Sequence, residues 1–268
     1  MTISAHNASN RRIFLQFIDL SVTTEPTVSE PVPVEIEYVS HGAGADILGK
    51  AGGLTRADFP DEAGLTIEYV KITSHSGTHV DAPSHFGPTT AGSRARNIDE
   101  MPLDWFFGPG VLLDCSVGDG PISADEVAAE LERIRHVLTP HEIVLIDSGA
   151  AKLWGKPSYF TDFRGMSREA TAYLVERGVR VIGIDSFGFD RPFHQMLQNY
   201  SEGGGQSELW PAHFYGRQRE YCHIERLANL EAIGRSSGFT VACFPVKLKD
   251  AGAGWTRVVA ILNGEDER

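Results

Sequence analysis

The sequence predicts an α/β (α+β) fold in which helices flank a mixed β-sheet. In the middle of the chain, segments of helical periodicity alternate with short apolar runs, and such short crossovers favour parallel strand pairing. Near the C-terminus, two strand-like runs are joined by a short glycine-containing segment that suits a hairpin. A chain of 268 residues can bury a sizeable core, and we expect one domain over residues 1–268.

The N-terminal third is expected to contain strands and loops. Residues 12–22 (RIFLQFIDLSV) are rich in β-formers and predict a strand. Residues 23–38 carry three prolines, which suit an extended loop rather than a central strand. The glycine-rich residues 41–53 are expected to form a flexible loop over a site. Alternation of apolar and polar residues predicts a strand over 65–75.

The middle of the chain is expected to alternate between helix and strand. Ser123 is followed three residues later by Glu126, which is the signature of a helix-starting capping box. Short apolar runs closed by turns are typical of buried strands. The expected elements are a helix over 123–137, a strand over 142–149, a helix over 166–178 that ends at Gly178, and a strand over 179–190.

The C-terminal part is expected to finish the sheet. Residues 239–248 and 255–262 predict two strands, joined by KDAGAG and able to form a hairpin. Before them, residues 200–213 are expected to form a long loop that leads to His213. Ser186 and Asp190 follow a predicted strand, and they are expected to approach a site because ligands gather at strand carboxyl ends.

Composition and charge narrow the class of protein. The formal net charge is −12, which disfavours binding to nucleic acid or to an anionic membrane surface. The three cysteines, Cys115, Cys222 and Cys243, form no CxxC pair, so neither a disulfide framework nor a thiolate zinc site is expected. We find no secretory signal and no apolar run long enough to span a membrane, and a cytoplasmic location is expected.

Residues 74–86 (SHSGTHVDAPSHF) concentrate histidine and aspartate. If this stretch continues the preceding strand, His75, His79 and Asp81 lie on one face, and Gly77 leaves room between them. Two imidazoles and a carboxylate suit a divalent ion such as Zn²⁺, Mn²⁺ or Fe²⁺, with a coordination position left for water or substrate. His85 would then be placed to transfer a proton. The alternative is a solvated strand edge that carries histidines.

A second cluster lies in residues 213–230 (HFYGRQREYCHIERLANL). Its possible ligands or acid–base groups are His213, Gln218, Glu220, His223 and Glu225. A strand over HIERL would place His223 and Glu225 on one face. A solvated, charged turn is an equally good interpretation of this segment.

Together these motifs resemble the cyclase family of metal-dependent hydrolases. The stretch HSGTHVDAPSHF is similar to the family signature HxGTHxDxPxH, and FIDLS, VIGIDSFGFDRPF and HIERLANL are similar to further family segments. The resemblance covers about residues 14–262. The family includes bacterial kynurenine formamidase, isatin hydrolase and trans-dienelactone hydrolase, and the long segments around Trp154 and Trp210 look closer to the isatin hydrolase-like members.

The resemblance implies a swivelling β/β/α domain, a homodimer or homotetramer, and one or two Mn²⁺ or Zn²⁺ ions. In the two-zinc members, His213 and Glu225 would hold the second ion, whereas in one-manganese members a glutamine such as Gln218 would take part. Both arrangements stay open. By matching position, the resemblance implies His85 as the catalytic acid–base group and metal ligands among His75, His79, Asp81, His213, Gln218 and Glu225.

The function that the resemblance implies is hydrolysis of a small cyclic amide or lactone, with isatin as a model substrate. Phe59, Trp105 and Trp210 are candidate walls of a pocket for a flat ring, although single aromatic residues are more often part of a core. The alternatives within the family are an N-formylkynurenine formamidase and a trans-dienelactone hydrolase. A metal- or ligand-binding protein that uses the same fold without catalysis is the non-enzyme alternative.

Overall fold

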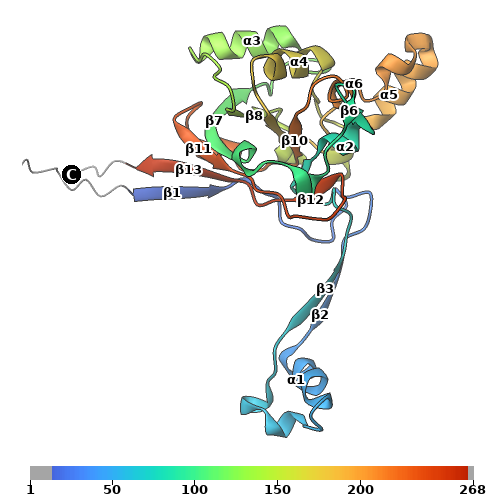
Figure 1. Cartoon of the computed structure of the whole chain (residues 1–268), viewed down its shortest axis with the longest axis vertical. Helices are drawn as coiled ribbons and strands as arrows, with labels where there is room; N and C mark the ends of the chain where they lie inside the picture. The colour runs from blue at the N-terminus through green and yellow to red at the C-terminus, as the bar shows by residue number, and fades with distance from the viewer. Residues whose placement is uncertain (1–13, 265–268) are drawn as a thin grey trace, which may run out of the picture.

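A nine-stranded mixed sheet forms the centre of the molecule (Figure 1). The computed structural model describes residues 14–264. From one edge to the other, the strands are β1 (Phe14–Asp19), β13 (Val259–Gly264), β11 (Phe239–Ala242), β7 (Phe107–Asp114), β8 (Ile143–Asp147), β9 (Val181–Ile184), β10 (Cys222–Glu225), β4 (His79–Asp81) and β12 (Ala253–Trp255).

Parallel pairing is confined to the middle of this sheet. Strands β7, β8, β9 and β10 run parallel to their neighbours within that group, and the other pairs are antiparallel. The mixed sheet predicted from the helix–strand alternation is therefore confirmed. Near the C-terminus, β11 and β13 pair in the antiparallel direction, but they are not joined as the predicted hairpin. The segment between them crosses to the opposite edge and adds β12 beside β4.

Helices α3 (Ala124–Arg133) and α4 (Arg168–Glu176) lie together over one face of the sheet (Figure 1). The predicted capping box is present, because the Ser123 side chain accepts from the Glu126 N–H and the Glu126 carboxylate accepts from the Ser123 N–H. Helix α4 ends just before Gly178, as expected. None of the helices in residues 14–264 has the length and apolar composition that crossing a membrane requires.

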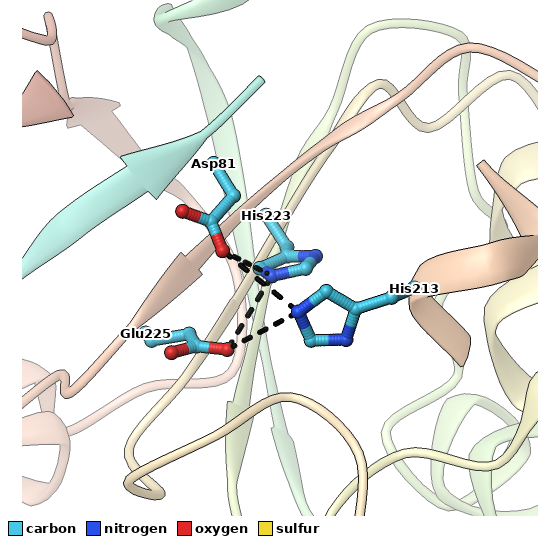
Figure 2. A group of neighbouring side chains, drawn as sticks. All are labelled: Asp81, His213, His223 and Glu225. Carbon is cyan, nitrogen blue, oxygen red and sulfur yellow. Dashed lines mark hydrogen bonds and ion pairs between the residues drawn. The ribbon is translucent and has the colours of Figure 1, made fainter. Parts of the chain in front are cut away.

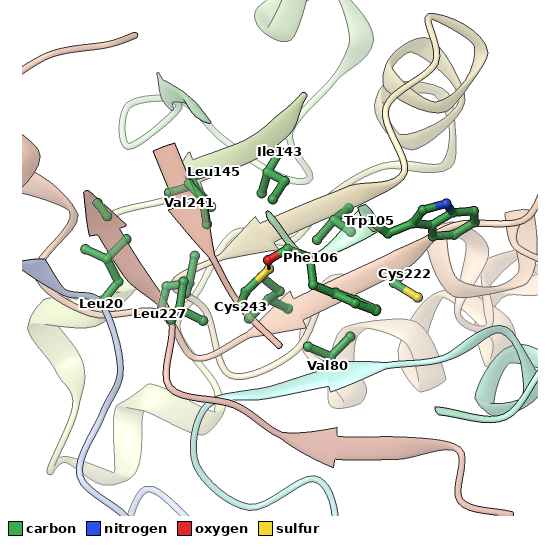
Figure 3. Packing of buried hydrophobic residues seen from close by; sticks show 14 of the residues in the cluster. Leu20, Val80, Trp105, Phe106, Ile143, Leu145, Cys222, Leu227, Val241 and Cys243 are labelled. Carbon is green, nitrogen blue, oxygen red and sulfur yellow. Dashed lines mark hydrogen bonds between the residues drawn. The ribbon is translucent and has the colours of Figure 1, made fainter. Parts of the chain in front are cut away.

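The central strands are buried on both faces of the sheet. In β8, Ile143 and Leu145 pack into one apolar cluster, while Val144 and Ile146 pack into the other, under α3 and α4. Figure 3 shows the first cluster. The three cysteines are buried and unpaired, as expected for a chain without disulfides. This core holds the carboxyl ends of the parallel strands in fixed positions.

An arm projects from the sheet (Figure 1). It consists of the hairpin of β2 (Glu35–Val39) and β3 (Ile67–Lys71), with α1 (His41–Lys50) at its tip, and neither strand pairs with the central sheet. The prediction of a flexible loop over a site at residues 41–53 is therefore wrong. Ser40 caps α1, and Gly44 packs so closely that a Cβ there would lie 1.9 Å from the Leu65 carbonyl oxygen.

Irregular helical turns and the start of one short helix occupy residues 200–213, the segment expected as one long loop. Helix α5 (Phe193–Asn199) is followed by irregular helical turns, and α6 (Pro211–Tyr215) carries His213. Pro211 occupies the first turn of α6, where a missing N–H costs nothing. The loop prediction was wrong here because the interruptions by glycine and proline separate short helical turns. Further short elements are helix α2 (Pro83–Phe86) and the paired strands β5 (Thr89–Thr90) and β6 (Ser93–Arg94).

Candidate metal centre

The first candidate ligands come from a tight turn and the short strand that follows it. The strand predicted over 65–75 is present in part as β3, but it ends at Lys71 and does not continue to Asp81. His75 lies in the turn that follows, and His79 and Asp81 lie on β4. Gly77, in the left-handed region with a φ of 64°, reverses the chain. The turn still brings the side chains together, since His75 Nδ1 lies 2.9 Å from Asp81 Oδ1.

Strand β10 supplies the next pair of side chains. His223 and Glu225 share one face, as predicted, and the antiparallel register places His223 opposite Asp81 and Glu225 opposite His79. His223 Nε2 lies 3.0 Å from Asp81 Oδ2 and 3.4 Å from Glu225 Oε1. Neighbouring strands therefore bring together residues that are more than 140 positions apart in the sequence.

Helix α6 adds His213 (Figure 2). The carboxylate of Asp190, which lies beyond the end of β9, accepts hydrogen bonds from the Ala212 and His213 N–H groups at 2.7 and 3.0 Å. It also accepts from His213 Nδ1 at 2.5 Å. The ring is thereby oriented so that its Nε2 lies 3.9 Å from Asp81 Oδ2 and 3.8 Å from Glu225 Oε1.

Asp81 belongs to two groups of side chains that have the composition of metal sites. One group is His75, His79 and Asp81, and the other is Asp81, His213, His223 and Glu225; within each group the candidate ligand atoms lie within 4.8 Å of one another. In the described part of the chain, the buried His79 Nε2 and Asp81 Oδ1 make no hydrogen bond of good geometry, although His75 Nδ1 lies 2.9 Å from Asp81 Oδ1. Buried polar atoms without partners are costly, so these two atoms fit coordination of a cation.

The protonation of the cluster also fits a cation. Burial lowers the pKa of His79 to about 4, so its imidazole is neutral at pH 7. Burial would raise the pKa of Glu225, but the hydrogen bond from His223 and the nearby His79 and His223 rings together outweigh it, and the pKa falls to about 2. For His223, burial is outweighed by the Asp81 and Glu225 carboxylates, which raise its pKa to about 9. The carboxylates of Asp81 and Glu225 therefore favour a positive charge beside them, which a bound divalent ion would supply.

His85 lies at the mouth of this cluster. The chain does not stay extended up to this residue, because Pro83 begins the single helical turn of α2. His85 Nε2 lies 3.8 Å from Asp81 Oδ2, and its ring centroid lies 4.3 Å from that of His75. Burial lowers its pKa to about 4, so the ring is neutral at pH 7 and able to accept a proton.

The structure does not bring three of the expected site residues to this cluster. The expected ligand Gln218 follows α6 and is exposed, and its side-chain oxygen accepts a hydrogen bond from Arg168 at 2.9 Å. Trp105 is buried in the core of the sheet (Figure 3). Phe59 lies in the arm, where its ring approaches Gly49. Tertiary packing, rather than residue type, decides these placements.

Trp210, in contrast, borders a cavity that opens onto the cluster. The cavity has a volume of about 200 Å³. Its other lining residues are His75, Asp81, His85, His213 and Glu225 from the cluster, together with Phe160, Phe163, Phe187, Gly188, Phe189, Asp190, Arg191, Phe193 and Met196. Metal-site side chains at one end and aromatic walls elsewhere suit a small, flat molecule. From the sequence, Arg191 was given no role in a site. His223 was named only as one of several possible ligands or acid–base groups in the second cluster.

Comparison with known proteins agrees with this architecture. A family model described as "Putative cyclase" matches residues 18–191, and the chain belongs to this family. Cyclase-like protein 1 of Arabidopsis thaliana is 25% identical over 197 residues, which are 66% of this chain and 74% of that protein. Kynurenine formamidase of Bordetella petrii is 28% identical over 142 residues, which are 51% of this chain and 59% of that protein.

Among solved structures, an isatin hydrolase bound to the product analogue thioisatinate has a similar fold. The TM-score is 0.71 at 20% sequence identity, and the superposition covers 93% of each chain. The chain therefore combines the fold seen in isatin hydrolase with a buried His/Asp/Glu cluster of metal-site composition.

Proposed function

We propose that this protein is a metal-dependent hydrolase that opens a small cyclic amide or lactone of the isatin type. One observation carries the proposal: Asp81 is shared by two groups of potential metal ligands at the end of a cavity with aromatic walls. The similarity in fold to an isatin hydrolase and the family membership support the same reaction class.

The residues that would hold the ions follow from the two groups. His75 and His79 would hold one ion, and His213, His223 and Glu225 would hold a second, with Asp81 between them. This set of imidazoles and carboxylates suits Zn²⁺ or Mn²⁺. When bound, a divalent ion supplies Lewis acidity, which polarises a carbonyl and lowers the pKa of a water molecule.

The chain itself would move the proton and place the substrate. The neutral His85 accepts a proton as water adds to the carbonyl carbon, and it returns this proton to the ring nitrogen or oxygen as the bond to that atom breaks. One water is consumed, and the product carries a new carboxylate and a free amine or hydroxyl group. The aromatic side chains of the cavity hold the ring in position.

His79→Ala tests this proposal most directly. We expect the variant to lose bound metal and hydrolysis together, because the buried Nε2 of His79 is an unpartnered ligand atom within the described chain. Elemental analysis and hydrolysis of isatin are measured on the same preparations. His194→Ala, an exposed histidine of α5, is the matched control. Full turnover by a metal-free His79→Ala variant would refute the mechanism.

A substrate panel separates the activities known from the family. Preferred hydrolysis of N-formylkynurenine would indicate a formamidase, and preferred hydrolysis of a dienelactone would indicate a dienelactone hydrolase. Metal binding without hydrolysis of any amide, ester or lactone would indicate a binding protein that uses the same fold.

We also propose that residues 1–268 act as one domain in a cytoplasmic homo-oligomer. Strands from both ends of the chain, β1 and β13, pair in the same sheet, which supports one domain. The buried, unpaired cysteines suit a reducing compartment. The arm supports an oligomer, because an isolated two-stranded hairpin has little stability in water by itself.

A further inference from the structure

We propose that Arg191 makes this site selective for substrates that carry a carboxylate on the ring, away from the bond that is cleaved. The inference rests on the proposed hydrolase function and specifies its substrate class. Arg191 lines the same cavity as His75, His85 and His213. Because the cavity volume is about 200 Å³, a ring-sized molecule that reaches the metal cluster also comes close to this guanidinium.

The guanidinium of Arg191 has spare hydrogen-bonding capacity. Its side chain is only 22% exposed, and within the described residues its one ion pair runs from Nη1 to Glu208 Oε2 at 3.4 Å. That distance exceeds the 2.7–2.9 Å of a charge-assisted hydrogen bond, and the same Glu208 oxygen already accepts from Asn199 at 3.0 Å. Five N–H donors in a planar fork match a carboxylate in two parallel hydrogen bonds.

The backbone that carries Arg191 is fixed relative to the metal cluster. The preceding residue, Asp190, accepts three hydrogen bonds from Ala212 and His213. Two residues before Arg191, the carbonyl of Phe189 accepts from the Met166 N–H at 2.6 Å, and the Phe189 N–H donates to Glu225 at 2.8 Å. The distance between a carboxylate bound by Arg191 and the bond to be cleaved is therefore set by the fold.

Charge within the cavity points to the same class of ligand. Three carboxylates line the cavity, those of Asp81, Asp190 and Glu225, and each would repel the carboxylate of a substrate. Such a substrate is therefore held best where a cationic side chain faces the cavity. Among the described lining residues, Arg191 is the one with a permanently charged cationic group. Aromatic side chains line the same cavity, and such apolar walls strengthen an ion pair formed within it.

Matched substrate pairs test this proposal. The metal-loaded protein is assayed with isatins that carry a carboxylate at one position of the benzene ring, and with the corresponding carboxamides, which are neutral and nearly isosteric. We expect at least one carboxylate isomer to exceed its amide in kcat/KM by about tenfold or more. Arg191→Met is expected to bring that ratio close to one. Arg191→Lys, which keeps the charge but not the fork, is expected to give an intermediate ratio.

A binding measurement separates failure of this inference from failure of the hydrolase proposal. Binding of benzoate and benzamide is compared by calorimetry in wild-type protein and in Arg191→Met. Arg257→Met serves as a control, because its guanidinium is exposed and pairs with Asp19. A preference for benzoate that disappears only in Arg191→Met supports the inference even if no compound is hydrolysed.

The proposed role of Arg191 is wrong if its replacement leaves the preference for carboxylates unchanged. If Arg191→Met keeps the wild-type preference for carboxylates in both assays, then the carboxylate is held elsewhere, for example at the metal. The inference also fails if wild-type protein shows no preference. In either case, hydrolysis of the neutral amides would leave the hydrolase proposal intact.

Discussion

At the scale of single residues, Asp81 is the point where the candidate site converges. Its two carboxylate oxygens face imidazoles from the turn, from β10, from α2 and from α6. A carboxylate with lone pairs in several directions can serve two ligand groups at once. The histidines around it differ in environment: His79 is fully buried, whereas His85 and His75 border the cavity. His85 also lies outside both groups of candidate ligands, so we expect it to transfer a proton rather than to hold a metal ion.

His85→Ala tests that expectation. We expect the variant to keep its metal but to lose about hundredfold or more in kcat, because general acid–base catalysis contributes on that order. Metal content by elemental analysis and kcat on isatin or on the best isatin carboxylate are measured together. Wild-type kcat across the pH range would remove His85 from the mechanism, and loss of metal would show that it is a ligand instead.

At the scale of elements, a buried ion pair ties the proline-containing loop to the metal site. Both oxygens of Glu30 lie 2.7 Å from Arg226 Nη1, and one of them accepts from the Gly77 N–H at 2.7 Å. Arg226 directly follows Glu225, and its carbonyl accepts from the Thr78 hydroxyl at 2.6 Å. Its guanidinium also lies 4.2 Å from the ring centroid of Phe187 in the cavity wall. One pair thus connects the loop, the histidine turn and the end of β10.

Removing one partner of this pair should destabilise the protein. We expect Arg226→Met to lower the free energy of unfolding by about 3–5 kcal/mol, because it leaves the Glu30 carboxylate buried without its counter-charge. The double variant Glu30→Gln/Arg226→Met should regain part of that loss. Urea denaturation followed by circular dichroism measures both. A loss below about 1 kcal/mol for Arg226→Met would show that solvent reaches the pair.

At the scale of the whole molecule, the arm is the feature on which our expectation of an oligomer rests. Tyr38 and Val70 lie on one face of the hairpin and Tyr69 on the other, and these side chains are 72%, 51% and 56% exposed, respectively. Leu48 and Leu54 near the tip are exposed as well. Apolar groups on both faces of a thin hairpin are expected to pack against a second copy of the chain.

Mass measurement in solution tests the role of the arm. We expect wild-type protein to elute as a dimer or tetramer, and the triple variant Tyr38→Lys/Tyr69→Lys/Val70→Thr to shift toward the monomer. Size-exclusion chromatography with light scattering gives the mass directly. Val137→Thr, an exposed residue far from the arm in sequence, is the control. A monomeric wild-type protein, or an unchanged mass for the triple variant, would contradict the expectation.

Much of the central fold could be predicted from local patterns. The capping box at Ser123, the apolar run of β8 and the alternation in β10 are all effects of residues within a few positions of one another. Such local patterns can be interpreted without knowing how the rest of the chain folds. The helix at 41–50 could not be predicted this way, because its glycines pack against a distant segment instead of loosening the backbone.

By itself, the sequence determined the family, the kind of sheet and the residue types of the metal centre, because the HSGTHVDAPSHF signature and the strand periods are local. Only the tertiary structure decided which of those residues meet. It brought His223 to Asp81 through strand pairing, oriented His213 through Asp190, left Gln218 on the surface and placed Arg191 in the cavity. The physical reason is that strand register and helix packing set distances between residues far apart in sequence, and no local pattern records those distances.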